Sequence, residues 1–119
     1  MDPLETAIRE LRQILASDSA SPEWRWNVRR RLSGVKDALT GPQARQPEAW
    51  LAARASLSHR ERSQLQGRVL ALSAGVLDKL EAATIVHEVR RLLGDLEHHV
   101  QRVHDLVYDS VSLELGGSE

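Results

Sequence analysis

The sequence predicts an all-α domain, arranged as an antiparallel four-helix bundle with a long C-terminal helix and a short extended C-terminal tail. Three observations support this fold class. Leucine, valine and isoleucine recur at intervals of three and four residues, which is the spacing of one helix face. Polar and proline-containing segments divide this pattern into parts. Only 3% of the 119 residues are aromatic although 41% are hydrophobic, a composition that suits helix packing.

The first helix is predicted to begin at Asp2-Pro3-Leu4-Glu5. This segment combines a carboxylate N-cap, a proline at the first helical position and the glutamate of a capping box. Its apolar stripe consists of Leu4, Ile8, Leu11 and Leu15. The helix should end near Ala16, because the small polar residues 17–21 favour a connection.

A second helix is predicted after Ser21-Pro22-Glu23, where the same start signal recurs. It should stop before Gly41-Pro42, since proline prevents the helix from continuing. A loop is expected from Thr40 to Gln46. The inner face of this helix is predicted to consist of Trp24, Val28, Leu32, Val35 and Leu39.

The third helical region is predicted to open at Pro47-Glu48. Its apolar pattern is interrupted at three polar positions and resumes later. The interruptions are Arg54, Ser58 and Glu61, and the resumed stripe is Leu65, Val69, Leu72 and Val76. Because residues 58–61 form a capping box, we expect either a kink near Leu57 or two short helices. A tight turn is expected between Gly75 and Asp78; the less favoured alternative is one continuous helix of more than about 50 residues.

The fourth helix carries the clearest periodicity, a coiled-coil-like seam. The seam comprises Val86, Val89, Leu93, Leu96, Val100, Val103 and Val107, and a second row beside it comprises Ile85, Leu92, His99 and Leu106. This wide stripe favours a helix with two neighbours in a bundle. Beyond it, Val111, Leu113 and Leu115 alternate with polar residues, which predicts an extended segment. We therefore expect one domain over residues 1–115 and a flexible tail over 116–119.

Composition excludes several classes of protein. The chain has no cysteine, which removes disulfides, thiolate metal sites and cysteine nucleophiles. Sixteen basic and seventeen acidic residues give a net charge of −1, too balanced to predict a polyanionic partner. The N-terminal residues do not resemble a secretion signal, and no apolar run approaches the length of a membrane span. We therefore expect a cytoplasmic protein that does not associate with membranes and needs no cofactor.

Catalytic and metal-binding patterns are weak. The glycines are scattered rather than clustered as in a phosphate-binding loop, and nothing resembles a nucleophile elbow. Five histidines suggest a metal site, but the Glu-x-x-His spacing of two-metal helical bundles is absent. The alternative metal or ligand site would combine Asp95, His98 and His99 with a polar group of the third helical region, such as Glu61.

Trp26 is the most informative single residue. At about 100° per residue it lies roughly 160° from the centre of its helix's apolar stripe, so it should face outward. Arg29 and Arg30 share its side of the helix, and Arg25 and Arg31 lie nearby. Such a surface suits an acidic peptide or a nucleic-acid strand. The structural alternative is that Trp26 packs under the 40–46 loop or against another helix.

The C-terminal segment combines acidic and apolar character. Residues 103–119 contain four acidic residues and no lysine or arginine. The apolar residues that suggest docking are Tyr108, Val111, Leu113 and Leu115, together with Val107. Three arrangements remain open: the segment folds back along its own bundle, adds as a strand to a partner's sheet, or meets the arginine face of another subunit.

These features predict a non-enzymatic protein-interaction or structural module that self-associates as a homo-oligomer. Its candidate contact surfaces are the Trp26 face and the acidic-apolar C-terminal segment. The alternatives are a metal- or ligand-binding helical bundle and weak nucleic-acid binding through the Arg/Trp helix face.

Overall fold

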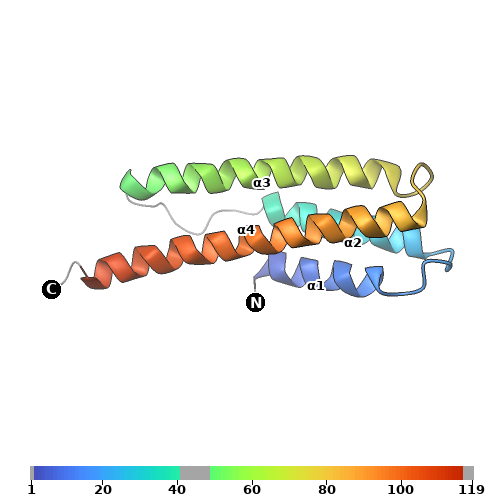
Figure 1. Ribbon diagram of the computed structural model, residues 1–119, viewed down its shortest axis with the longest axis horizontal. Coiled ribbons are helices and arrows are strands. Elements are labelled where there is room, and N and C mark those ends of the chain that lie inside the picture. The colour runs from blue at the N-terminus through green and yellow to red at the C-terminus, as the bar shows by residue number, and fades with distance from the viewer. Residues whose placement is uncertain (1, 41–48, 117–119) are drawn as a thin grey trace.

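The computed structural model describes residues 2–40 and 49–116, and the side chains of residues 2–40 and 58–106. These residues form four helices and no strand: α1 (Pro3–Leu15), α2 (Trp24–Thr40), α3 (Ala49–Gly75) and α4 (Ala82–Gly116). Figure 1 shows the four helices side by side along the long axis of the molecule. The predicted all-α class is confirmed. Within the same residues, no helix is both long and apolar enough to cross a membrane.

Helix α1 begins where its sequence predicts. The side chain of Asp2 accepts a hydrogen bond of 3.1 Å from the Leu4 backbone N–H, which satisfies one of the unpaired amides at the helix start. Ala16 ends the helix and donates its N–H to the Arg12 carbonyl over 3.1 Å. The predicted stripe is buried in full: Leu4, Ile8, Leu11 and Leu15.

Helix α2 also buries the predicted face. Its buried residues are Trp24, Val28, Leu32, Val35 and Leu39. The indole N–H of Trp24 donates to the Ile14 carbonyl over 3.1 Å, so this buried ring finds a partner for its one polar atom. The bond joins the start of α2 to the end of α1.

Helix α3 corrects the prediction of a kink or of two short helices. It runs without interruption through Leu57 and the capping-box pattern that follows it. The Glu61 carboxylate does not turn back to cap the helix start, because it pairs with His99 and Arg102 on α4. The alternative of one helix continuing into the next region is wrong as well, since α3 ends at Gly75 and α4 begins at Ala82.

Helix α4 corrects the prediction of an extended C-terminal segment. The backbone is helical as far as Gly116, and residues 117–119 lie outside the described part. Val107, Val111 and Leu115 are four residues apart, so this stretch also has a helical period, and no proline or glycine interrupts it before Gly116. Three alternating residues were too short a pattern to decide between the two structures.

One apolar core joins the four helices. Helix α1 contacts α2 and α4, and α3 contacts the same two helices. On α4 the row beside the predicted seam is the more completely buried, since Ile85, Leu92 and His99 are almost inaccessible whereas Val86 and Val100 are partly exposed. The buried apolar residues of α3, of α4 and of the turn between them are Leu65, Val69, Val76, Ile85, Val89, Leu92, Leu93 and Leu96.

Two arginines bind backbone carbonyls of neighbouring segments. Arg62, on α3, donates to the carbonyls of Ala38 and Leu39 at the end of α2, where the helix dipole places partial negative charge. Arg25, near the start of α2, donates to the carbonyls of Val76 and Leu80 in the turn between α3 and α4. The two arginines therefore join α2 to α3 and to the turn that follows it.

The four helices do not cover the same length of the molecule. The start of α1 lies level with His104 of α4, since Glu5 pairs with that imidazole over 3.4 Å. The end of α2 lies level with Arg62 of α3. Residues 49–60 of α3 and 105–116 of α4 therefore extend beyond both α1 and α2 (Figure 1). The molecule measures 60 × 21 × 20 Å, and we call this part the projecting end.

Candidate functional site

Trp26 lies on the outer face of α2, as its position in the sequence predicts. Its side chain is 57% exposed, whereas Trp24, two residues earlier, is buried. The guanidinium carbon of Arg30 lies 5.8 Å from the centroid of the Trp26 ring, within the range of a cation–π contact. Arg29 is exposed on the same side of the helix. We call Trp26, Arg29 and Arg30 the Trp26 face.

Arg25 and Arg31 do not belong to the Trp26 face. Arg25 is occupied by the carbonyls of Val76 and Leu80, so its role is structural. Arg31 pairs with Glu10 of α1 over 2.8 Å. All four arginines lie close together in the sequence. Which of them remain available to a partner depends on which side of α2 faces α1 and α3.

The acidic-apolar site residues of the C-terminal segment lie outside the part of the chain whose side chains are described. They are Tyr108, Val111, Leu113 and Leu115. Their backbone belongs to α4. Because this backbone is helical and continues α4 beyond α1 and α2, the segment neither folds back along the core nor presents an extended strand.

The alternative metal set is not assembled. Asp95 is exposed and pairs with Arg68 over 2.5 Å. His98 is exposed on the outside of α4, whereas His99 faces the core and is only 1% exposed. The structure does join His99 to Glu61, the residue of the third helical region that the sequence suggests for such a site: Nδ1 lies 2.6 Å from Oε1.

Glu61, His99 and Arg102 form one polar cluster between α3 and α4. Arg102 donates from Nε to Oε1 of Glu61 over 3.0 Å, and from a terminal nitrogen to Oε2. Partial burial by itself would raise the pKa of the Glu61 carboxyl, but the hydrogen bonds and charges of Arg102 and His99 together lower it below the ordinary value of 4.5. The carboxylate is therefore ionised at neutral pH. The Nε2 atom of His99 is buried without a hydrogen-bond partner among the described residues.

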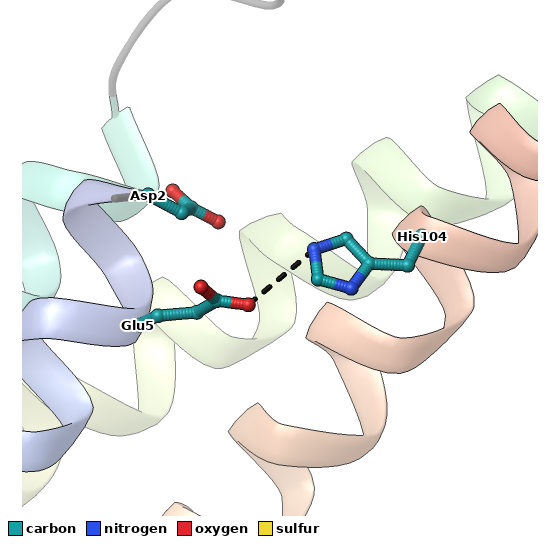
Figure 2. Close-up of side chains that lie close together, drawn as sticks. All are labelled: Asp2, Glu5 and His104. Carbon is teal, nitrogen blue, oxygen red and sulfur yellow. Dashed lines mark ion pairs between the residues drawn. The ribbon is translucent and has the colours of Figure 1, made fainter.

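A second polar group gathers where α1 meets α4, and the sequence pattern does not predict it. Figure 2 shows Asp2, Glu5 and His104 pointing toward one another. One potential ligand atom from each lies within 4.8 Å of the others, so this group could hold a divalent cation weakly. Asp2 already caps α1, and Glu5 pairs with His104. No local motif could reveal the group, because His104 lies about 100 residues from its partners.

A shallow depression of about 300 Å³ lies between α3 and α4 near their connecting turn. Its lining combines leucines with charged residues at the rim: Arg68, Ala71, Leu72, Leu80, Glu88 and Leu92. The only lining side chain with a potential nucleophile is the carboxylate of Glu88. Its most basic member, Arg68, is already paired with Asp95.

No protein-family model, curated protein or solved structure matches this chain.

Proposed function

We propose that the protein is a non-enzymatic interaction module, and that the Trp26 face binds an acidic segment of a protein partner. The observation that carries the proposal is the exposure of Trp26, which at 57% leaves a large ring in water. Tryptophan and arginine are the residue types that contribute most to protein interfaces when a partner covers them.

The charge around Trp26 favours an acidic partner. Arg29 and Arg30 are both exposed, and the nearest acidic residue in the sequence, Glu23, is three positions before Trp26. A glutamate or aspartate of the partner would pair with these arginines, and an apolar side chain beside it would cover the indole. Two arginines form a small footprint for a nucleic-acid strand, which is usually met by an extended basic stripe.

The test measures binding of a labelled synthetic peptide in which glutamates alternate with leucines and tyrosines. We expect the wild-type chain to bind it, and Trp26→Ala and Arg29→Ala/Arg30→Ala each to weaken binding at least tenfold. Leu70→Ala is the matched control, because Leu70 is 51% exposed on α3 and outside the Trp26 face. A peptide with glutamine in place of every glutamate should bind weakly.

Two outcomes would contradict the proposal. Equal binding of the acidic and glutamine peptides would show that charge plays no part. Tighter, salt-dependent binding of a single-stranded oligonucleotide than of the acidic peptide would replace the protein partner with nucleic acid.

The architecture we propose is an antiparallel four-helix bundle. Contacts between α1 and α4 support it, because Glu5 pairs with His104 and Arg12 with Glu97, so residue numbers rise along one helix as they fall along the other. The pairs between α3 and α4 follow the same order.

Engineered disulfides test this direction in a chain that has no cysteine of its own. Arg12→Cys/Glu97→Cys should oxidise within one molecule. Glu5→Cys/Glu97→Cys is the control and should not, because the antiparallel order separates these positions by about 10 Å along the axis. The reverse result would contradict the arrangement.

A further inference from the structure

We propose that the partner of the Trp26 face binds as an acidic amphipathic α-helix, which lies along α2 and α3 with its apolar stripe on Trp26, Leu70 and Leu77. The inference rests on the proposed function, because Trp26 and Arg29 anchor the same partner. It adds the conformation of that partner and a second row of contacts on α3. We call Trp26, Arg29, Leu70 and Leu77 the α2–α3 surface.

The first observation concerns the exposed apolar side chains. Among the side chains that the structure describes, the large exposed hydrophobic ones are Trp26, Leu70 at 51% and Leu77 at 40%. The two leucines are seven residues apart, which is two turns of helix, or about 10.5 Å along the axis. Single exposed leucines are ordinary. A leucine pair in one row beside an exposed tryptophan is not, so the direction in which each of them faces matters.

The contacts of α3 show which side of that helix carries Leu70. Arg62 donates to carbonyls at the end of α2, whereas Arg68 pairs with Asp95 on α4. At about 100° per residue, Leu70 lies about 80° around the helix from Arg62 and about 160° from Arg68. Leu70 therefore lies on the α2 side of α3 and away from α4.

Leu77 and Arg29 lie close to the same boundary. Leu77 follows Val76, whose carbonyl accepts a hydrogen bond from Arg25. Arg29 is four positions after Arg25, or about 40° around α2, so it lies on the α3 side of that helix. By the antiparallel order, Arg29 is level with about residue 72 of α3, between the two leucines. Trp26 projects outward beside it.

The connection between α2 and α3 begins and ends away from this surface. Residues 41–48 join Thr40, which is level with Arg62, to Ala49, which lies farther toward the projecting end (Figure 1). Leu70 lies about 12 Å from Arg62 in the opposite direction. The four side chains of the α2–α3 surface are themselves described, and all four are exposed.

The charge of this surface has one sign. Residues 24–36 contain five basic residues and no acidic one, and residues 63–77 contain one basic residue and no acidic one. Glu23, Asp37 and Asp78 lie just outside these segments. A helix that docks here therefore needs acidic residues beside its apolar stripe, so that they meet the arginines of α2.

The spacing of the contacts favours a helix over a strand. A strand repeats every two residues, or about 7 Å, which does not match the distance of about 10.5 Å between the two leucines along α3. A helix packed alongside α3 has the same repeat of seven residues. Three turns of such a helix are about 16 Å long and bury less than the roughly 1,200 Å² of a standard interface. We therefore expect micromolar affinity.

The test uses the full chain and a labelled 18-residue peptide with leucines spaced three and four apart and glutamates beside them. Wild type should bind it, and the peptide should gain helicity by circular dichroism. A scrambled peptide of equal composition should bind at least tenfold more weakly. Leu70→Ala/Leu77→Ala should weaken binding of the helical peptide at least tenfold. His87→Ala/His98→Ala is the matched control, because both histidines are exposed on α4, and it should leave binding unchanged.

The alternating peptide of the proposed function separates the two proposals. Its leucines and tyrosines would spread around a helix, so it should respond to Trp26→Ala but not to Leu70→Ala/Leu77→Ala. Failure of both peptides to bind would refute the proposed function itself. Binding of both peptides with no effect of the leucine substitutions, or with an equal effect on each, would overturn the helical partner alone. A dimer of the chain that Trp26→Ala dissociates would place a second copy on this surface instead.

Discussion

The contact between His99 and Glu61 joins two groups in unequal surroundings. His99 is 1% exposed and has one ring nitrogen without a partner, whereas the Glu61 side chain is 29% exposed and is also held by Arg102. Loss of a buried partner costs more than loss of a partner at the surface, because water can replace only the latter. The two residues should therefore respond differently to substitution.

We expect Glu61→Leu to destabilise the fold by about 1–3 kcal/mol, because the Nδ1–H of His99 would remain buried and unpaired. His99→Leu removes the buried imidazole and leaves Glu61 with Arg102, so its effect should be close to zero or stabilising. Urea unfolding of both variants and of the double variant measures the difference. An equal loss from both single substitutions would contradict this asymmetry.

The same cluster predicts how stability depends on pH. The pKa of Glu61 is lowered in the folded state, so its contribution to stability is present above the unfolded value of about 4.5 and is lost as pH falls through the folded value. Glu61→Gln should therefore be less stable than wild type at pH 7, and the difference should shrink as pH drops below about 4.5. Unfolding midpoints across this range measure it; a constant difference would contradict the prediction.

Residue-level features were predictable where one helix decides them. The buried stripes of α1 and α2 and the outward position of Trp26 follow from a period of 3.6 residues alone. The separation of Arg25 from Arg29 and Arg30 was not predictable. It depends on the position of the turn between α3 and α4, which brings free carbonyls to Arg25.

At the level of elements, the difference between α3 and its prediction has a physical cause. Glu61 interrupts the apolar pattern of α3, and this interruption predicts a break because an ionised side chain is costly inside a core. In the structure this carboxylate faces His99 and Arg102, so the polar residue has partners from α4 and the helix continues. Hydrophobic periodicity cannot foresee a partner that another helix supplies.

Gly75 ends α3 and lies against Leu80, and this predicts opposite effects for two glycine substitutions. A Cβ added at Gly75 would lie 3.0 Å from Leu80 Cδ1, whereas one at Gly67, in the middle of α3, would meet nothing within 4 Å. Gly67→Ala should stabilise the fold by about 0.5–1 kcal/mol. Gly75→Ala should give no such gain, because Leu80 must move. Thermal unfolding compares the two; an equal gain at both positions would contradict the close packing of the turn.

At the scale of the whole molecule, the core should supply most of the stability of the fold and the projecting end little of it. Every side chain described as buried belongs to residues 4–99. A chain ending at residue 106 should therefore unfold cooperatively, with Tm lowered by less than about 4 °C when both proteins are monomeric. Scanning calorimetry measures the change in Tm, and loss of a cooperative transition would show that residues 107–119 support the core.

The bonds of Arg25 and Arg62 also hold two segments that would otherwise open easily. The last turn of a helix normally frays independently, and its amide hydrogens exchange quickly with solvent. Arg62, anchored on α3, holds carbonyls in the last turn of α2, and Arg25, anchored on α2, holds carbonyls in the turn after α3. Removing the Arg62 guanidinium should therefore speed deuterium uptake near residues 36–40, and removing that of Arg25 should speed it near residues 76–80.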